Sequence, residues 1–298
     1  MNPVFIVGCG DIGQRVAKIY QQASAPAETR VYGLARSAAS MQRLRSAAIE
    51  PIAGDLSRPP SLSAMPTAGA TVFYFTPPPG EGQTDPLIRH FLAAVDRQAL
   101  PQRLVLLSTT AVYGDCHGEW ITEQQAVHPQ TARGQRRWDA EQAARQWSAE
   151  TGVPLVILRV GGIYGSGRLP IARLQQGLPI LREEESPFTN RIHQDDLAQI
   201  CVAAAQRGLP GEVYNVADGQ PGTMTQYFKA VAAACGLPPP TEVSLQEAKA
   251  VMSAGMLSYL QESRRLDTRK LRDGLGVRLQ YPSLAAGLQP IAEGEAAP

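Results

Sequence analysis

Three glycines near the start of the chain have the spacing of a phosphate-binding turn. Gly8, Gly10 and Gly13 follow a short apolar run and precede a segment with helical spacing. A buried strand, a tight turn and a helix in this order bind the pyrophosphate of a dinucleotide, because the backbone can approach it and the helix presents free N–H groups. We therefore predict that these glycines, with Asp11 and Ile12, bind a pyrophosphate. The alternative is a glycine-rich turn that binds no ligand.

Polar residues at the ends of the next two predicted strands would complete the dinucleotide site. Arg36 ends the strand predicted at 30–36, where such sites usually have an acidic residue that binds the ribose hydroxyls. An arginine there accommodates a 2′-phosphate, which favours NADP over NAD, unless Arg36 is only a solvated residue. Asp55, followed by Leu56, ends the strand predicted at 50–56. Its carboxylate either accepts from the adenine amino group or caps the next helical turn.

The apolar run at 70–75 leads into a proline-rich segment that begins with Thr76. Such a segment must form a loop, and loops at the carboxyl edge of a parallel sheet line the ligand crevice. We predict that Thr76 lies at the inner edge of the cofactor.

Strands alternate with helices through the first 160 residues, which predicts an α/β fold of the Rossmann type with a doubly wound parallel sheet. The remainder has more proline and glycine breaks and only short strand candidates, apart from an apolar run at 212–217 that would return to the main sheet. We therefore predict three parts: a dinucleotide-binding domain at 1–165 plus 212–221, a smaller interleaved substrate lobe at 166–211 plus 222–290, and a frayed tail at 291–298.

Composition and charge exclude several classes of function. The net charge of +1 supplies no general attraction to nucleic acid or to an anionic membrane. No apolar run reaches the roughly 18 residues of a membrane-spanning helix, and the first residues lead directly into a strand rather than a signal peptide. The cysteines lack CxxC pairing, so we expect a cytoplasmic protein without a structural metal. These cysteines are Cys9, Cys116, Cys201 and Cys235.

Five segments together are similar to one protein family. They are residues 8–13, 108–115, 159–165, 190–197 and 214–216. In this order they resemble the extended short-chain dehydrogenase/reductases, the NAD(P)-dependent epimerases and dehydratases of nucleotide sugars, and the likeness extends over about residues 4–290. The resemblance implies an NAD(P) cofactor and an oxidoreductase or epimerase-like activity on a polar, sugar-like small molecule.

The resemblance also implies catalytic positions, and here the chain departs from the family. Thr109 stands where the family has a catalytic Ser or Thr, with Ser108 beside it toward the cofactor. Family members then have Tyr-x-x-x-Lys on the following helix, the tyrosine as general acid/base and the lysine on the nicotinamide ribose. The surrounding frame places Arg133 at the tyrosine position and Arg137 at the lysine position. An arginine keeps its proton near neutral pH, so the usual acid/base pair is absent.

Three interpretations of this departure are open. The chain is an atypical member in which Arg133 and Arg137, four apart on one helical face, bind a phosphate or carboxylate of the substrate and cofactor. Alternatively it is an active enzyme whose proton comes from Tyr113, Tyr164 or Tyr74. In the third interpretation the arginines belong to a solvated basic turn. A non-catalytic NADP-sensing protein is the alternative to an enzyme.

The remaining expectations concern the later part of the chain. We predict that Tyr164 and Arg191 face the substrate, with Arg191 on a phosphate if the substrate is nucleotide-linked. His193 is expected to be structural, with Asp195 capping a helix.

Family members often dimerise through two long helices, expected here at 86–100 and 136–150. Their apolar stripes are equally explained by packing on the sheet, so a homodimer is an expectation only.

Overall fold

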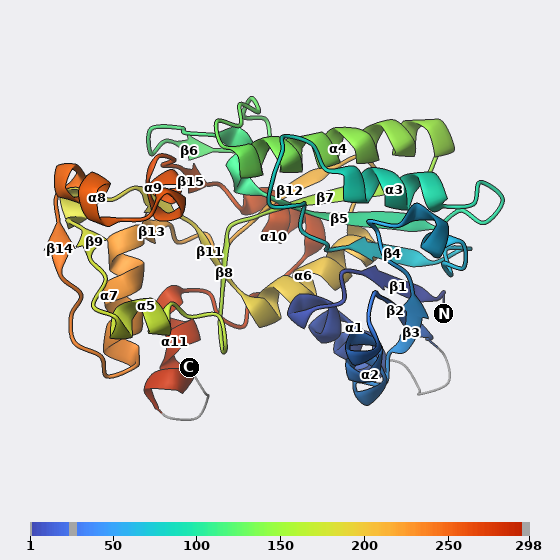
Figure 1. Ribbon diagram of the computed structural model, residues 1–298, viewed down its shortest axis with the longest axis horizontal. Helices are drawn as coiled ribbons and strands as arrows, with labels where there is room; N and C mark the ends of the chain where they lie inside the picture. The colour runs from blue at the N-terminus through green and yellow to red at the C-terminus, as the bar shows by residue number, and fades with distance from the viewer. Residues whose placement is uncertain (1, 24–28, 294–298) are drawn as a thin grey trace.

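A seven-stranded parallel sheet forms the centre of the molecule (Figure 1). The computed structural model describes residues 2–23 and 29–293. The strands are apolar on both faces because helices cover both sides, as in other parallel sheets. In sheet order they are β3 (Glu50–Ala53), β2 (Val31–Ala35), β1 (Val4–Val7), β4 (Thr71–Tyr74), β5 (Arg103–Thr109), β7 (Leu155–Val160) and β12 (Val213–Val216). The predicted Rossmann-type sheet is confirmed, including the late strand that joins its edge.

Helices pack on both faces of this sheet (Figure 1). On one face α3 (Pro86–Ala94) and α4 (Ala132–Thr151) enclose one apolar core. On the other, α1 (Asp11–Ala23), α2 (Ala38–Ser46) and α6 (Gln194–Arg207) enclose a second core. Strand order reverses between β1 and β4, and in such sheets the ligand crevice lies outside the carboxyl ends of the strands at that point.

A smaller lobe lies at one end of the sheet and has its own apolar core (Figure 1). Its helices are α5 (Ile171–Gln175), α7 (Met224–Ala234), α8 (Leu245–Val251), α9 (Ala254–Leu260) and α11 (Leu284–Ala292). Within the described ranges, four short strand pairs lie outside the main sheet. They are β8 (Gly162–Tyr164) with β11 (Arg191–His193), β9 (Ile180–Leu181) with β14 (Glu242–Val243), β10 (Phe188–Thr189) with β13 (Gly222–Thr223), and β6 (Trp120–Ile121) with β15 (Arg265–Leu266).

The packing differs from the predicted division of the chain at two helices. We placed α6 and α10 (Arg269–Leu275) in the substrate lobe, but their apolar residues belong to the core under the main sheet. The reason is that α6 lies against α1, so a segment inside the lobe's sequence range returns to the dinucleotide-binding half. The predicted tail also begins too early, because α11 continues to Ala292, and residues 294–298 lie outside the described residues.

The two helices considered for dimerisation lie side by side on the sheet (Figure 1). Arg89 of α3 pairs with Asp139 of α4 at 2.6 Å, and Arg97 beyond α3 pairs with Glu150 at 3.2 Å. Their buried residues pack in the core beneath them, and dimerisation stays a prediction. Among the described residues, no helix combines the length and apolar character that crossing a membrane requires.

Candidate functional site

The glycine turn joins β1 to α1 with the geometry that a pyrophosphate needs. Gly8 has a φ of +88°, and a Cβ there would lie 2.5 Å from the backbone nitrogen of Thr76, so a side chain is excluded. A Cβ on Gly10 would meet no protein atom within 4 Å. Gly10 instead accepts the first helical bond from Gln14, at 2.9 Å, and leaves the N-terminus of α1 open. The predicted turn therefore has open space where an anion would bind helix N–H groups.

A cavity of about 200 Å³ continues from this turn toward the end of β2. Arg43 and Ser40 of α2 line it, together with Cys9, Gly10, Asp11, Gln14, Leu34 and Leu44. Arg36, the predicted contact for the adenosine end, is exposed and is not among the lining residues. The position of Arg43 beside the turn could not be predicted from the sequence, because it depends on how α2 packs.

The Asp55 carboxylate organises a local turn, and its predicted contact with adenine stays a prediction. Its Oδ1 accepts from the backbone nitrogen and the hydroxyl of Ser57, at 2.9 and 2.7 Å. These bonds hold the pKa of the Asp55 carboxyl below its ordinary value. The carboxylate is thus available as an acceptor while it also organises the turn. Leu56, also predicted at the cofactor, has a buried side chain in the core under α3.

Arg137 reaches the loop that begins with Thr76. Its guanidinium donates to the Thr76 carbonyl at 3.1 Å, and the Gly8 turn packs against the same residue. The predicted cofactor residues Thr76 and Arg137 therefore lie together at the carboxyl edge of the sheet, next to the glycine turn. Burial lowers the pKa of Arg137, partly opposed by the charge of Asp85. Within the described residues Arg137 forms no ion pair, so its remaining donors are available to a ligand.

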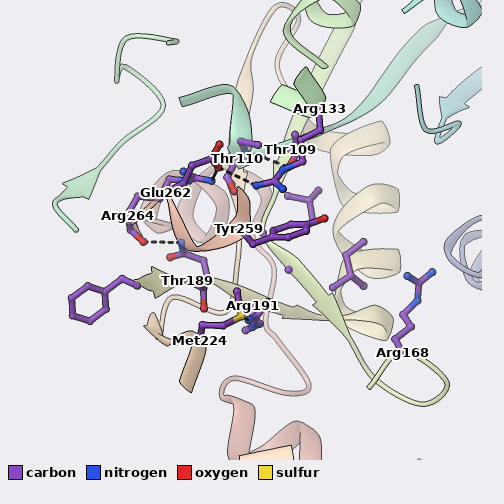
Figure 2. A pocket seen from close by; sticks show the side chains of 17 residues that line it. Thr109, Thr110, Arg133, Arg168, Thr189, Arg191, Met224, Tyr259, Glu262 and Arg264 are labelled. Atoms are coloured by element: carbon purple, nitrogen blue, oxygen red, sulfur yellow. Dashed lines mark hydrogen bonds and ion pairs between the residues drawn. The ribbon is translucent and has the colours of Figure 1, made fainter. Parts of the chain in front are cut away.

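The main cavity, of about 360 Å³, lies between the ends of β5 and β7 and the lobe (Figure 2). Four arginines and one glutamate line it: Arg133, Arg168, Arg191, Arg264 and Glu262. This excess of positive charge favours an anionic ligand. The remaining lining residues are Thr109, Thr110, Ala111, Val160, Gly161, Gly162, Ile163, Phe188, Thr189, Asn190, Met224 and Tyr259.

Arg168 connects this cavity with the glycine turn. Its Nε lies 2.9 Å from Oδ2 of Asp11, whose Oδ1 accepts from Arg15 at 2.9 Å. Arg168 comes from the loop after β8, so the ion pair spans from the lobe to the first residue of α1. A ligand in the cavity and one on the glycine turn would therefore be neighbours.

Arg133 points into the cavity and is held there (Figure 2). Its guanidinium carbon lies 3.7 Å from the centroid of the Tyr259 ring, and it donates to the Ser258 hydroxyl at 3.0 Å. The buried carboxylate of Glu262 lies 3.5 Å away and also pairs with Arg264 at 2.9 Å. The third interpretation, a solvated basic turn, is wrong because this segment opens α4. Arg133 and Arg137 also contact separate groups rather than forming one clamp.

The hydroxyls at the end of β5 point in different directions. Thr109 lines the cavity, and its Oγ1 accepts from the backbone nitrogen of Ala111 at 3.4 Å. Ser108, predicted at the cofactor, is buried instead, and its hydroxyl donates to Glu141 at 2.6 Å. Adjacent strand residues face opposite sides of the sheet, so only one of the two can face the cavity.

The tyrosines considered as proton donors are buried outside this cavity. The Tyr113 hydroxyl donates to Asn215 at 2.7 Å, and burial raises its pKa to about 12. Tyr164 donates to the Ser283 carbonyl at 3.1 Å inside the lobe core, and burial also raises its pKa. Tyr74 lies under α3 with no partner for its hydroxyl among the described residues. The structure therefore does not support Tyr113 as catalytic or Tyr164 as a substrate contact.

Arg191 lies between the main cavity and a second one of about 280 Å³. Its guanidinium carbon is 4.0 Å from the Tyr227 ring centroid, and its Nε has no partner among the described residues. This position agrees with a role at an anionic group of a ligand, which stays a prediction.

His193, not Asp195, caps α6. The His193 Nδ1 accepts from the backbone nitrogen of Asp195 at 3.3 Å, and burial lowers the histidine pKa. Asp195 instead lies in the first turn of the helix, where its charge is favourable.

The buried carboxyl of Asp218 is expected to make the stability of the protein depend on pH. Its buried carboxyl is desolvated, which raises its pKa to about 6, and its Oδ1 accepts from Gln220. The folded state therefore favours the protonated form, and that stabilisation is lost as pH rises from the unfolded value near 4 through about 6. We expect the free energy of unfolding to fall by about 3 kcal/mol over this range from this group. Urea titrations at several pH values should show that the free energy of unfolding of Asp218→Asn depends less on pH than that of the wild type.

Asp96 supplies the matched control for this measurement. Its Oδ1 accepts from Gln98 at 2.8 Å in the same local arrangement, but the side chain is exposed. Asp96→Asn should leave the pH profile as in the wild type. An Asp218→Asn profile as steep as that of wild type would contradict the prediction.

Arg168, Tyr259, Glu262 and Arg264 line the cavity but could not be recognised from the sequence. They lie in loops and a short helix whose periodicity is weak. The only signal was the three charged residues within 262–265, and their order does not tell which way the side chains point.

Comparisons with known proteins agree with the fold. The sequence model of the NAD dependent epimerase/dehydratase family matches residues 4–217. A functionally unknown conserved protein from Silicibacter pomeroyi has a solved structure that is 30% identical, with all of both chains covered and a TM-score of 0.82. dTDP-glucose 4,6-dehydratase from Bacillus anthracis, solved with NAD, is 15% identical with a TM-score of 0.76, covering 98% of this chain and 96% of that one.

Among curated proteins the similarity is confined to shorter stretches. The uncharacterized protein y4nG of Sinorhizobium fredii is 25% identical over 138 residues, which is 44% of this chain and 34% of that protein. The match therefore spans about a third of the curated relative's length.

Proposed function

This chain belongs to the NAD-dependent epimerase/dehydratase family, and from that premise we propose that it is an NADP-using oxidoreductase or epimerase. Its substrate would be a polar, sugar-like small molecule that carries an anionic group. The observation that carries the proposal is the Arg168–Asp11 ion pair, because it makes an arginine-lined cavity the direct neighbour of an open dinucleotide turn.

The residues around the turn fit a dinucleotide. Gly10 leaves space for the pyrophosphate, the α2 cavity would take the adenosine end, and Arg137 would hold the inner ribose from its place at Thr76. When bound, the nicotinamide supplies or accepts hydride. Thr109 would donate a hydrogen bond from its hydroxyl to the reacting oxygen of the substrate. The cavity arginines would orient the anionic group of the substrate.

A preference for NADP is supported by the position of Arg43 beside the glycine turn. We expect Arg43→Ala to weaken NADPH binding about 10- to 100-fold, the value of one charge-assisted hydrogen bond, and to change NADH binding little. Calorimetric titration with each dinucleotide measures this, with Arg36→Ala run in parallel to test the residue chosen from sequence.

Arg45 lies on the same helix, is exposed and does not line the cavity, so Arg45→Ala is the matched control. Equal affinity of the wild type for NADH and NADPH, unchanged in Arg43→Ala and in Arg36→Ala, would contradict the preference for NADP.

A second candidate is a non-catalytic protein that binds NADP and changes its contacts with a partner. It is favoured by the replacement of the family's acid/base pair with Arg133 and Arg137, neither of which can transfer a proton near neutral pH. The two candidates differ in turnover, because a sensor leaves the redox state of its cofactor unchanged.

The deciding experiment incubates the protein with NADP or NADPH and a panel of nucleoside diphosphate sugars that includes UDP-glucose and dTDP-glucose. Nicotinamide absorbance follows net redox change, and chromatography of the sugars detects epimerisation. We expect at least one compound to be converted in a dinucleotide-dependent reaction. Tight NADPH binding without conversion of any compound would favour the sensor instead.

A further inference from the structure

The position that the family's catalytic tyrosine would occupy has a tyrosine beside it, contributed by another element. Arg133 stands at that position on α4, and its guanidinium stacks on Tyr259 of α9 at 3.7 Å from the ring centroid. Figure 2 shows the Tyr259 ring below Arg133, and both residues line the cavity together with Thr109. A phenol is therefore present in the cavity although α4 does not supply it.

Tyr259 differs from the other tyrosines because a ligand in the cavity and the solvent can both reach it. All nine tyrosines lie within the described residues, and it alone lines the main cavity. Its relative exposure is 52%, and its hydroxyl has no hydrogen-bond partner among the described residues, whereas the Tyr113 hydroxyl is held by Asn215. A hydroxyl that is free, reachable by ligand and in contact with solvent can exchange a proton with both.

The carboxylate of Glu262 also lines the cavity, and several donors hold it in place. It is 4% exposed and is engaged by Arg133, Arg264 and the Thr131 hydroxyl, the last two at 2.9 and 3.1 Å. These three donors occupy the two carboxylate oxygens as hydrogen-bond acceptors. Glu262 therefore anchors Arg133, and Arg133 in turn supports the Tyr259 ring.

We propose that Tyr259 is the catalytic acid/base of this chain, held by Arg133, which has replaced the usual tyrosine. This inference rests on the proposed oxidoreductase or epimerase function. In the reducing direction the Tyr259 O–H bond breaks and its proton goes to the substrate carbonyl oxygen, while the carbonyl carbon receives hydride from the nicotinamide. The phenolate regains a proton from water. In the oxidising direction the same atoms move in reverse, so the step is balanced.

Arg133 is a positioning residue in this scheme, since it touches the ring and not the reacting atoms. The ring face attracts its charge, and the Ser258 and Glu262 contacts fix the guanidinium in turn. Truncation of Arg133 should lower kcat through Tyr259 while leaving the affinity for NADPH unchanged.

The test compares Tyr259→Phe with wild type on whichever panel sugar the wild type converts. General acid/base catalysis contributes roughly 100- to 10,000-fold, so we expect kcat to fall by at least about 100-fold. NADPH affinity by calorimetry should stay within about twofold of wild type, since the ring is kept and only a hydroxyl is removed. Tyr281→Phe is the matched control, because Tyr281 is a partly exposed tyrosine that does not line the cavity.

A rescue experiment separates proton transfer from packing. In Tyr259→Ala, added phenol should restore part of the lost kcat, whereas toluene, which has the ring but no hydroxyl, should not. Arg133→Ala should lower kcat with unchanged NADPH affinity and should not respond to phenol.

Each outcome decides a different statement. If the wild type binds NADPH but converts no compound, the proposed oxidoreductase or epimerase function is wrong, and this inference with it. If the wild type is active and Tyr259→Phe retains more than half of kcat, this inference alone is overturned. Equal rescue by phenol and toluene would likewise overturn it, since the ring would then act by packing.

Discussion

Replacing Gly10 by valine is expected to weaken NADPH binding about 100-fold while leaving the free energy of unfolding as in the wild type. A Cβ at Gly10 meets no protein atom within 4 Å, so the side chain fits the protein itself. The same space lies over the open N-terminus of α1, where the pyrophosphate would approach the backbone. Calorimetry with NADPH and urea unfolding of the same preparation measure the two quantities.

Gly8 provides the contrasting variant. Its φ of +88° and the 2.5 Å approach to the Thr76 nitrogen make alanine unfavourable in the protein itself. Gly8→Ala should therefore lower the free energy of unfolding by at least about 2 kcal/mol. If Gly10→Val binds NADPH as tightly as wild type, the pyrophosphate does not lie on this turn.

Replacing Glu141 by alanine is expected to lower the free energy of unfolding by about 3–5 kcal/mol. Glu141 is fully buried on α4, and its two oxygens accept from Arg159 of β7 at 3.0 and 2.7 Å. The Ser108 hydroxyl of β5 also donates to it, at 2.6 Å. Removing the carboxylate leaves a buried guanidinium without its partner and a buried hydroxyl without its acceptor, and both are costly. Urea unfolding measures the change.

Glu150 gives a control on the same helix. It pairs with Arg97 at 3.2 Å, but both side chains are about half exposed, so Glu150→Ala should lower the free energy of unfolding far less than Glu141→Ala. If Glu141→Ala loses no more free energy of unfolding than Glu150→Ala, the buried cluster does not hold α4 against the sheet. The attachment of α4 to the sheet matters for the site, because α4 also carries Arg133 and Arg137.

Much of the dinucleotide-binding half could be predicted because its signals are local. Apolar runs of four to seven residues became the strands, and the glycine spacing placed the turn between β1 and α1. Helix starts were less predictable, since α4 begins at Ala132 and not near Arg136, and His193 took the cap expected of Asp195. A capping bond depends on a single rotamer, which residue type alone does not specify.

Side-chain direction limited the predictions for the cavity. Ser108 and Thr109 are adjacent hydroxyls at the same strand end, yet Ser108 bonds to the buried Glu141 and Thr109 faces the cavity. Tyr113 was equally plausible from its place in the chain, but its hydroxyl is used by Asn215 inside the core. Which face of β5 becomes the cavity is decided by what packs on the other face.

The local order of residue types was sufficient for the Rossmann-type sheet and for the glycine turn between β1 and α1, since each depends on neighbouring positions in the sequence. The contents of the cavity depended on tertiary structure. Tyr259 reaches Arg133 from 126 positions further along the chain, and Arg168 reaches Asp11 across 157. Such contacts arise because the lobe folds back over the carboxyl edge of the sheet, and no periodicity or spacing in the sequence encodes that approach.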